Sequence, residues 1–180
     1  MRQKSDRNPS TWTIGAAVAV LLWSGSALAG ADGGPPHDAD HGSTVELGVA
    51  GTVLHDGHHL LGAGGPFVEL VLLPRWLHLE VAGLFGRAGH DNVAIFDVVL
   101  KYPYHLTEMV TLFGGLGLTV PFVGGEGRTE AHPGLTVVGG ACLWLLPPFG
   151  VLAQGVFNVL SAGGGAHAEG GARVGIAVHL

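Results

Sequence analysis

A regular alternation of apolar and polar side chains constrains this chain more than any other feature of its sequence. It is clearest in residues 75–87, RWLHLEVAGLFGR. One face of that stretch carries Leu77, Leu79, Val81 and Phe85, and the other carries His78, Glu80, Ala82 and Leu84. Successive side chains of a β-strand point to opposite sides, so this pattern predicts a strand with one apolar face.

The same alternation recurs to the last residue and predicts eight strands, at 44–54, 60–72, 75–87, 92–102, 109–122, 134–146, 149–161 and 168–180. Short turns join them, with Asp56-Gly57 as a hairpin signal and prolines near 74 and 147 that interrupt a ladder. The segment 123–133 is expected to be the longest loop, and 103–108 another connection. Sequential strands with short connections favour an up-and-down antiparallel barrel.

The start of the chain has the pattern of a secretory signal peptide. Residues 1–29 combine a basic start, an apolar run and the small-residue site Ala27-Leu28-Ala29. An uncleaved anchor helix is the alternative interpretation. Residues 30–43 are expected to be a flexible polar lead, and residues 44–180 the barrel. The sequence therefore predicts an exported protein with one folded domain.

Composition favours a barrel in a membrane over a soluble one. Charged residues make up 12% of the chain, about half the roughly 25% that is usual in soluble domains. A soluble exterior needs more charge than these strands supply. The single cysteine, Cys142, excludes an intramolecular disulfide framework. The alternative is a soluble periplasmic barrel that turns its apolar faces inward and binds an apolar ligand.

Aromatic residues near the predicted strand ends support the membrane interpretation, because outer-membrane barrels carry aromatic girdles at both interfaces. The candidates at the end with the proline turns are Trp76, Tyr102, Tyr104, Trp144 and Phe149. Phe85, Phe122 and Phe157 fall toward the other end. Ordinary core aromatics would be the alternative.

In strand number, alternation and turn pattern, residues 44–180 resemble the small eight-stranded outer-membrane barrels of the OmpA transmembrane-domain, OmpX and OmpW kind. The resemblance implies an all-β transmembrane barrel in the outer membrane of a diderm bacterium, surrounded by outer-membrane lipid and inserted by the barrel-assembly machinery. Members usually end on an aromatic residue, whereas this chain ends on Leu180. The implied role is structural or one of surface interaction.

The polar faces predict a network inside the barrel. Its members are Glu46, Glu69, His78, Glu80, Asp97, Lys101, Gln154, Asn158 and Arg173. Glu69 and Glu80 face each other across a hairpin and are expected to share a cation or a proton. The network is either a polar plug that fills the barrel or the lining of a narrow channel for ions or small solutes. Eight strands leave an interior just wide enough for side chains, which favours the plug.

Histidines gather in the turns at the end opposite the proline turns, namely His55, His58, His59, His90, His132 and His167. Imidazole is the commonest transition-metal ligand, and Asp56, Asp91 or Glu130 could complete a divalent metal site there. The other interpretation is that they are polar turn residues. A metal-handling barrel therefore remains an alternative function.

Enzymatic and nucleic-acid functions find no support in the sequence. The GxSxG, HExxH and CxxC motifs are absent, and neither Ser43 nor Ser161 has an activating neighbour. The net charge of −6 and the lack of a basic patch argue against nucleic acid. We therefore expect a protein that is not an enzyme, has no cofactor beyond a possible metal, and has lipid as its main partner.

Overall fold

The computed structural model describes residues 45–55, 59–73, 76–125, 128–146, 148–162 and 165–180. The predicted signal peptide and polar lead lie outside these residues. The strands are β1 (Val45–His55), β2 (Leu60–Leu73), β3 (Leu77–Ala88), β4 (Asp91–His105), β5 (Val110–Gly125), β6 (Arg128–Ala131), β7 (Gly134–Leu146), β8 (Phe149–Ala162) and β9 (Gly165–His179). None of the described residues forms a helix long and apolar enough to cross a membrane.

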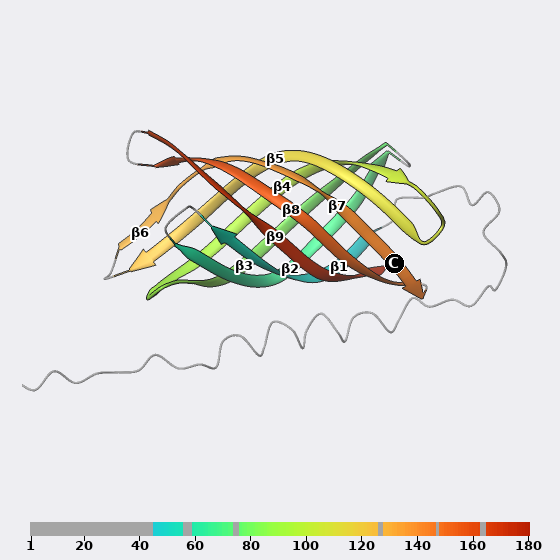
Figure 1. Ribbon diagram of the computed structural model, residues 1–180, viewed down its shortest axis with the longest axis horizontal. Coiled ribbons are helices and arrows are strands. Elements are labelled where there is room, and N and C mark those ends of the chain that lie inside the picture. Colours follow the sequence, from blue (N-terminus) through green and yellow to red (C-terminus); the bar gives the residue numbers. More distant parts are fainter. Residues whose placement is uncertain (1–44, 56–58, 74–75, 126–127, 147, 163–164) are drawn as a thin grey trace, which may run out of the picture. The chain divides into compact units, whose positions relative to one another are not determined.

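The strands close into an antiparallel barrel (Figure 1). Each barrel strand pairs with its neighbours in the chain, β1 pairs with β9, and the barrel consists of β1–β5 and β7–β9. The short β6 pairs only with the end of β5 and continues the line of β7. The prediction of an all-β, eight-stranded, up-and-down barrel is confirmed.

Closure involves a stagger between strands. A row of paired residues that starts at Lys101 and is followed once around the barrel returns to Asp91, ten residues away on the same strand. Such a shift tilts the strands relative to the barrel axis. Residues far apart in the sequence are thereby brought to the same height on opposite walls.

The barrel has two distinct ends. The loop end, at the left of Figure 1, carries the turns β1–β2, β3–β4, β5–β6 and β8–β9. The terminal end, at the right, carries the turns β2–β3, β4–β5 and β7–β8 together with Leu180.

Two predicted connections are wrong in extent. The expected loop 123–133 is largely strand, because β5 runs to Gly125 and pairs with β6. Its exposed, mostly polar residues hid it from the alternation pattern. The expected connection 103–108 is shortened because β4 runs to His105. Pro103 is tolerated there since β3 pairs with β4 no further than Lys101, so the missing N–H of Pro103 is not needed on that side.

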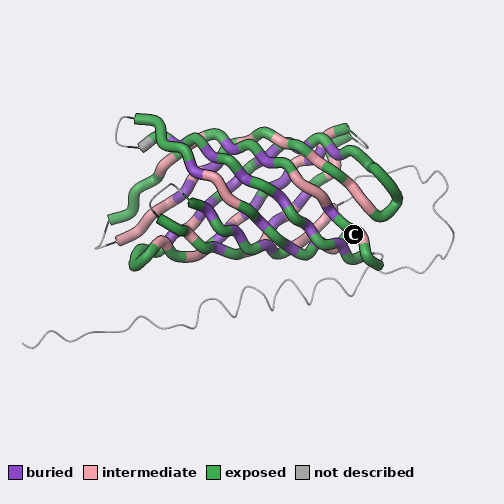
Figure 2. The backbone as a smooth tube through the Cα atoms, in the orientation of Figure 1, coloured by how far each residue is buried: buried purple, intermediate pink, exposed green. Residues whose placement is uncertain are grey.

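Burial alternates along the strands (Figure 2). Every barrel strand carries exposed large hydrophobic side chains, among them Leu116 and Leu118 on β5 at 59% and 60%. The side chains on the other face point inward and are mostly buried or half-buried. The apolar faces therefore lie outside, as predicted for a membrane barrel and opposite to a soluble one.

The interior contains two apolar clusters besides its polar groups. One consists of Leu54, Ala63, Leu84, Val93, Ile95, Val99, Val138 and Val156. The other consists of Ala50, Phe67, Ala82, Leu152 and Ala177, with Phe113 and Trp144 packed against it. Leu84 and Val99 have no exposed surface. Side chains therefore fill much of the interior.

Candidate functional site

A chain of alternating charges runs through the interior of the barrel. His78 Nδ1 lies 2.7 Å from Glu69 Oε1, and Lys101 Nζ donates a hydrogen bond of 2.7 Å to Glu69 Oε2. The same ammonium also donates to Oε2 of Glu80. The predicted sharing of a cation by Glu69 and Glu80 is thus explained by Lys101, which bridges the two carboxylates.

Arg173 extends the chain across the barrel. Its Nη1 donates to Glu80 Oε1 at 3.1 Å, and its Nη2 donates to Oδ2 of Asp97. Asp97 is on β4 and Arg173 is on β9, with three strands between them on either side. The Arg173–Asp97 ion pair therefore spans the interior from one wall to the opposite one. We call the set His78, Glu69, Lys101, Glu80, Arg173 and Asp97 the charge network.

Strand register brings the charge network together. Glu69 lies directly opposite Glu80 on β2 and β3, and His78 lies opposite Lys101 on β3 and β4. All members occupy inward positions of the alternation and are at most 8% exposed. The Lys101 ammonium also lies 4.5 Å from the centre of the Phe113 ring, a cation–π contact.

Mutual pairing makes this buried charge tolerable. An isolated buried ion loses several kcal/mol of hydration, and only close opposite charges with good hydrogen bonds recover that loss. Here three carboxylates are bridged by one ammonium and one guanidinium, with His78 as an additional partner. The arrangement can hold four strands in register. Because these charges are paired with one another, the network needs no bound ion or cofactor to neutralise them.

The remaining predicted interior residues lie outside the charge network. Glu46 is at the terminal end, where its Oε1 is 3.4 Å from His179 Nδ1. Gln154 is buried and has no hydrogen-bond partner for its amide among the described residues. Asn158 Nδ2 donates to Glu169 Oε1 at 3.1 Å. Glu169 was missing from the predicted interior set, although its spacing of four from Arg173 already placed it on the same face.

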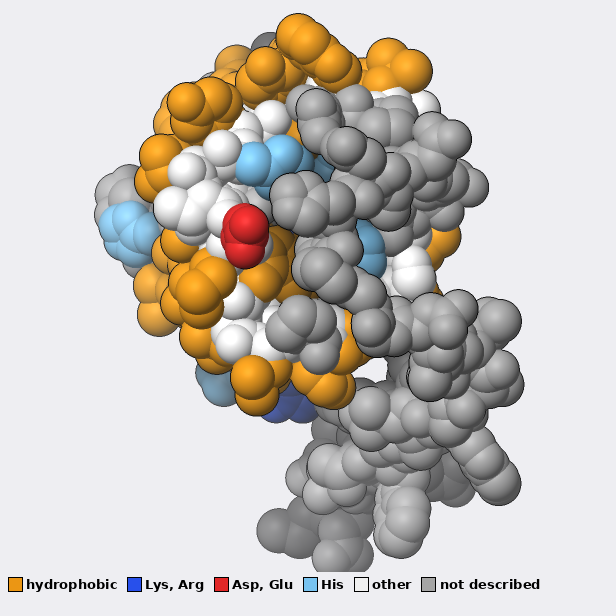
Figure 3. Space-filling view, turned by 90° about the vertical axis from the view of Figure 1, so that its right-hand side faces the viewer, with side chains coloured by type: hydrophobic (Ala, Val, Ile, Leu, Met, Phe, Trp, Pro, Cys, Tyr) orange, Lys and Arg blue, Asp and Glu red, His pale blue; other side chains and the backbone are white. Residues whose placement is uncertain are grey.

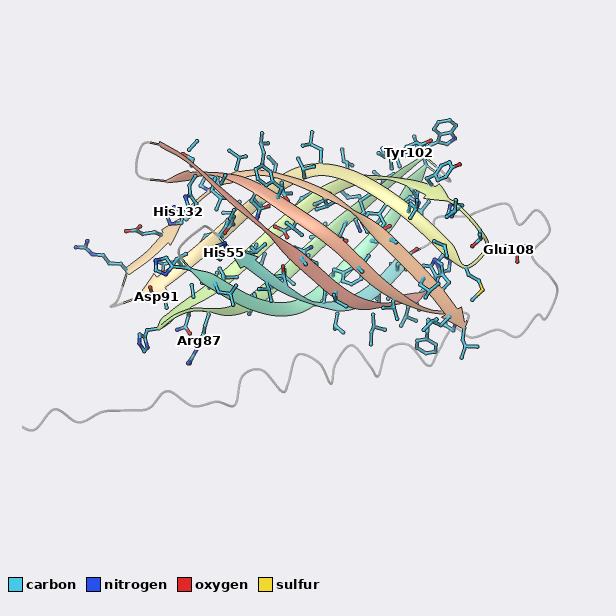
Figure 4. The ribbon with its side chains drawn as sticks, in the orientation of Figure 1. His55, Arg87, Asp91, Tyr102, Glu108 and His132 are labelled. Atoms are coloured by element: carbon cyan, nitrogen blue, oxygen red, sulfur yellow. The ribbon has the colours of Figure 1, made fainter. Side chains whose placement is uncertain are left out.

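Four of the five predicted interface aromatics are exposed at the terminal end: Trp76, Tyr102, Tyr104 and Phe149. The rings of Trp76 and Tyr102 meet edge to face at 6.0 Å between centroids, and Figure 4 shows Tyr102 at that end. In the view onto this end, hydrophobic side chains form most of the rim, an acidic side chain lies inside it, and histidine side chains lie both inside it and at its outer edge (Figure 3).

Trp144 is not an interface residue, which corrects the sequence prediction. It packs against the interior cluster around Leu152, and its ring lies 5.7 Å from that of His179. The reason is parity, because Trp144 is two residues from the buried Cys142 whereas Leu143 and Leu145 face outward. At the other end, Phe96 makes edge-to-face contacts with both Phe85 and Phe122.

The loop-end histidines do not form a metal site among the described residues. The structure places His55, His59, His90, His132 and His167 near the loop end, and Figure 4 shows His55 and His132 there with Asp91. No group of three or more His, Cys, Asp or Glu side chains within the described ranges is arranged to hold a metal ion. His58 lies outside those ranges, so the metal hypothesis for the full set stays a prediction.

Comparison with solved structures places this geometry among known barrels. The N-terminal β-barrel domain of Pseudomonas aeruginosa OprF matches with a TM-score of 0.63 at 10% identity, covering 76% of this chain and 97% of that one. Ail, the attachment invasion locus protein of Yersinia pestis, matches with a TM-score of 0.56 at 16% identity over 77% and 97%. Neisserial surface protein A gives 0.54 at 15% identity over 76% and 96%.

No protein-family model matches the chain, and no curated protein matches its sequence. The similarity therefore lies in strand number, pairing and closure, which the structure shows directly. The chain has the fold of the small eight-stranded outer-membrane β-barrels.

Proposed function

We propose that this protein is an integral outer-membrane β-barrel of a diderm bacterium, with a structural or surface-interaction role and a closed interior. The observation that carries the proposal is that apolar side chains lie outside and charged ones inside, the reverse of a soluble protein. Exposed side chains of the barrel wall are large and hydrophobic, whereas Glu80, Lys101 and Arg173 are at most 3% exposed inside. In water this arrangement would expose a continuous apolar surface, whereas in a bilayer that surface meets lipid.

Strand length supports the same role. The barrel strands contain between 11 residues in β1 and 16 in β5, and a tilted strand of roughly 9–11 residues crosses a bilayer. Residues 1–29 supply the export signal in this proposal, and the barrel-assembly machinery inserts the chain. Outer-membrane lipid is the main partner, with no enzymatic activity and no nucleic-acid partner.

The surface part of the role is supported by two of the similar structures and by the loop end. Two of the similar structures are named as a surface protein and an attachment protein. The loop end here carries exposed polar residues on β6, including Arg128 and Glu130. We propose that the loop end faces the outside of the cell, where these residues are available to other molecules.

Membrane fractionation tests the location. The protein should remain with the outer membrane until detergent is added, and its extracted form should migrate differently on a gel before and after boiling, because a closed barrel resists unfolding by detergent alone. Release into the soluble periplasmic fraction without a heat-dependent shift would contradict the proposal and favour a soluble barrel with an apolar ligand.

A narrow channel is the second candidate, favoured by the line of charged side chains from His78 to Asp97. Planar-bilayer recording separates the two functions. A plug predicts no conductance above the lipid background, and it predicts that Glu80→Ala and Arg173→Ala destabilise the barrel. A channel predicts conductance that these changes alter while the fold persists.

A further inference from the structure

A second polar group lies in the interior, separate from the charge network and nearer the loop end. Thr136 on β7 pairs directly with Asn158 on β8, and Asn158 pairs directly with Glu169 on β9. All three face inward, and their exposures are 1%, 2% and 9%. The row therefore places a hydroxyl, an amide and a carboxylate side by side on three adjacent strands.

Hydrogen bonding leaves several oxygen atoms of this row available. Asn158 uses Nδ2 to donate to Glu169 Oε1, so the amide is oriented with its Oδ1 acceptor turned away from that bond. Within the described residues this Oδ1 has no hydrogen-bond partner, and neither does Oγ1 of Thr136. Thr119 lies on the neighbouring strand β5, two residues from the position that pairs with Thr136. Its Oγ1 is also buried and has no hydrogen-bond partner among the described residues.

The charge of Glu169 is also uncompensated within the part of the chain that the structure describes. Glu69, Glu80 and Asp97 each contact a lysine or arginine, whereas the one side-chain contact of Glu169 among the described residues is the neutral amide of Asn158. A buried carboxylate of this kind requires a positive charge or a proton. The amide oxygen of Asn158 can only accept, so a cation would satisfy it and the carboxylate together.

We propose that Glu169, Asn158 and Thr136, with Thr119 nearby, form a binding site for one alkali-metal cation. Hard cations prefer oxygen ligands, and the atoms of this row that lack a partner among the described residues, Oδ1 of Asn158 and Oγ1 of Thr136, are oxygens. A single carboxylate matches a single positive charge. Glu169 lies close to the start of β9 at Gly165, so the ion enters from the loop end. The site goes beyond the membrane role and requires no conduction through the barrel.

Thermal unfolding of the detergent-extracted protein tests the site. Sodium or potassium chloride is exchanged for choline chloride at constant ionic strength, and the midpoint is followed by circular dichroism. A ligand that binds only the folded state raises the midpoint in a saturable way. We expect the wild-type midpoint to rise with sodium or potassium concentration, whereas choline, which is too large for the row, should leave it unchanged.

Variants assign the effect to this row. Glu169→Gln should unfold at a higher temperature than the wild type in choline, because the buried charge is gone, and should not respond to sodium or potassium. Thr136→Val keeps the side-chain shape and removes one ligand, and should raise the half-saturating concentration about tenfold. Glu108→Gln is the matched control, because Glu108 is an exposed acid at the terminal end and its loss should leave the cation response intact.

Three results would overturn the site. One is a wild-type midpoint that is equal in sodium, potassium and choline. Another is a cation response that persists in Glu169→Gln. The third is an infrared band of a protonated carboxyl at neutral pH in sodium buffer that Glu169→Gln lacks, which would assign a proton to Glu169 instead of an ion. None of these results would affect the membrane location, which fractionation tests independently.

Discussion

The ammonium nitrogen of Lys101 lies 2.7 Å from Oε2 of Glu69, two strands away, and also binds Glu80 on the strand between them. One buried cation thus links β2, β3 and β4 from inside the barrel. The two carboxylates sit directly opposite each other in the β2–β3 ladder. Without the ammonium they would repel each other at close range in a site where water cannot screen them.

Replacing Lys101 by an uncharged residue should strongly destabilise the barrel. Lys101→Met keeps much of the side-chain length and leaves Glu69 and Glu80 facing each other, so we expect a loss of about 3–5 kcal/mol in the free energy of unfolding. Urea unfolding in lipid vesicles, followed by tryptophan fluorescence, measures it. Adding Glu69→Gln and Glu80→Gln to Lys101→Met should restore much of the loss. A single-variant loss below about 1 kcal/mol, as for an exposed pair, would contradict the bridging role.

The ion pair across the interior should be measurable as a coupling. In a double-mutant cycle, Arg173→Met and Asp97→Asn should show an interaction energy of about 0.5–3 kcal/mol, because each change removes the same contact between opposite walls. Pairing Arg173→Met with Glu130→Gln on the exposed β6 provides the control, and these two effects should add. Additive losses for Arg173 and Asp97 would mean that their contact contributes nothing to stability.

A charged substitution on the outward face should destabilise the barrel, and the loss of stability should be larger near the middle of the membrane than near its surface. Leu118 is 60% exposed on β5, and Leu118→Arg should cost about 2–4 kcal/mol of stability in lipid if this face meets the bilayer core. Ser161→Arg, at the exposed end of β8, should cost about 0–1 kcal/mol. Equal and small effects at both positions would argue that water surrounds the barrel.

Two adjacent glycines on β7 should respond differently to alanine. A Cβ at Gly140 would lie 2.2 Å from the carbonyl oxygen of Ala153 on β8, whereas a Cβ at Gly139 would come no nearer than 3.9 Å to Phe113 O. Gly140→Ala should therefore lose about 1–3 kcal/mol through overpacking. Gly139→Ala should stay within about 0.5 kcal/mol of the wild type. The same vesicle unfolding assay compares them, and equal losses would contradict the close approach of β7 and β8.

Alternation in the sequence predicted on which face of its strand nearly every residue of the charge network and of the apolar exterior lies. It placed Leu79 and Glu80 on opposite faces, and likewise Val98 and Lys101. In the structure Glu80 and Lys101 are buried, whereas Val98 is exposed and Leu79 half-buried. The same parity would have placed Trp144 inside, had it been applied in preference to the tendency of aromatics to gather at membrane interfaces. The extent of β5 and β6 was not predictable in this way, because exposed polar strand residues carry no alternation signal.

The sequence by itself determined the eight barrel strands, their order and the side on which most of their side chains lie, because side-chain direction follows from local backbone geometry. Which charges meet was decided only by the tertiary structure. Arg173 contacts Glu80 and Asp97 because β1 pairs with β9 and the closed barrel is staggered by ten residues. The partners of each charge therefore depend on closure of the whole sheet, a relationship between distant strands that no local pattern records.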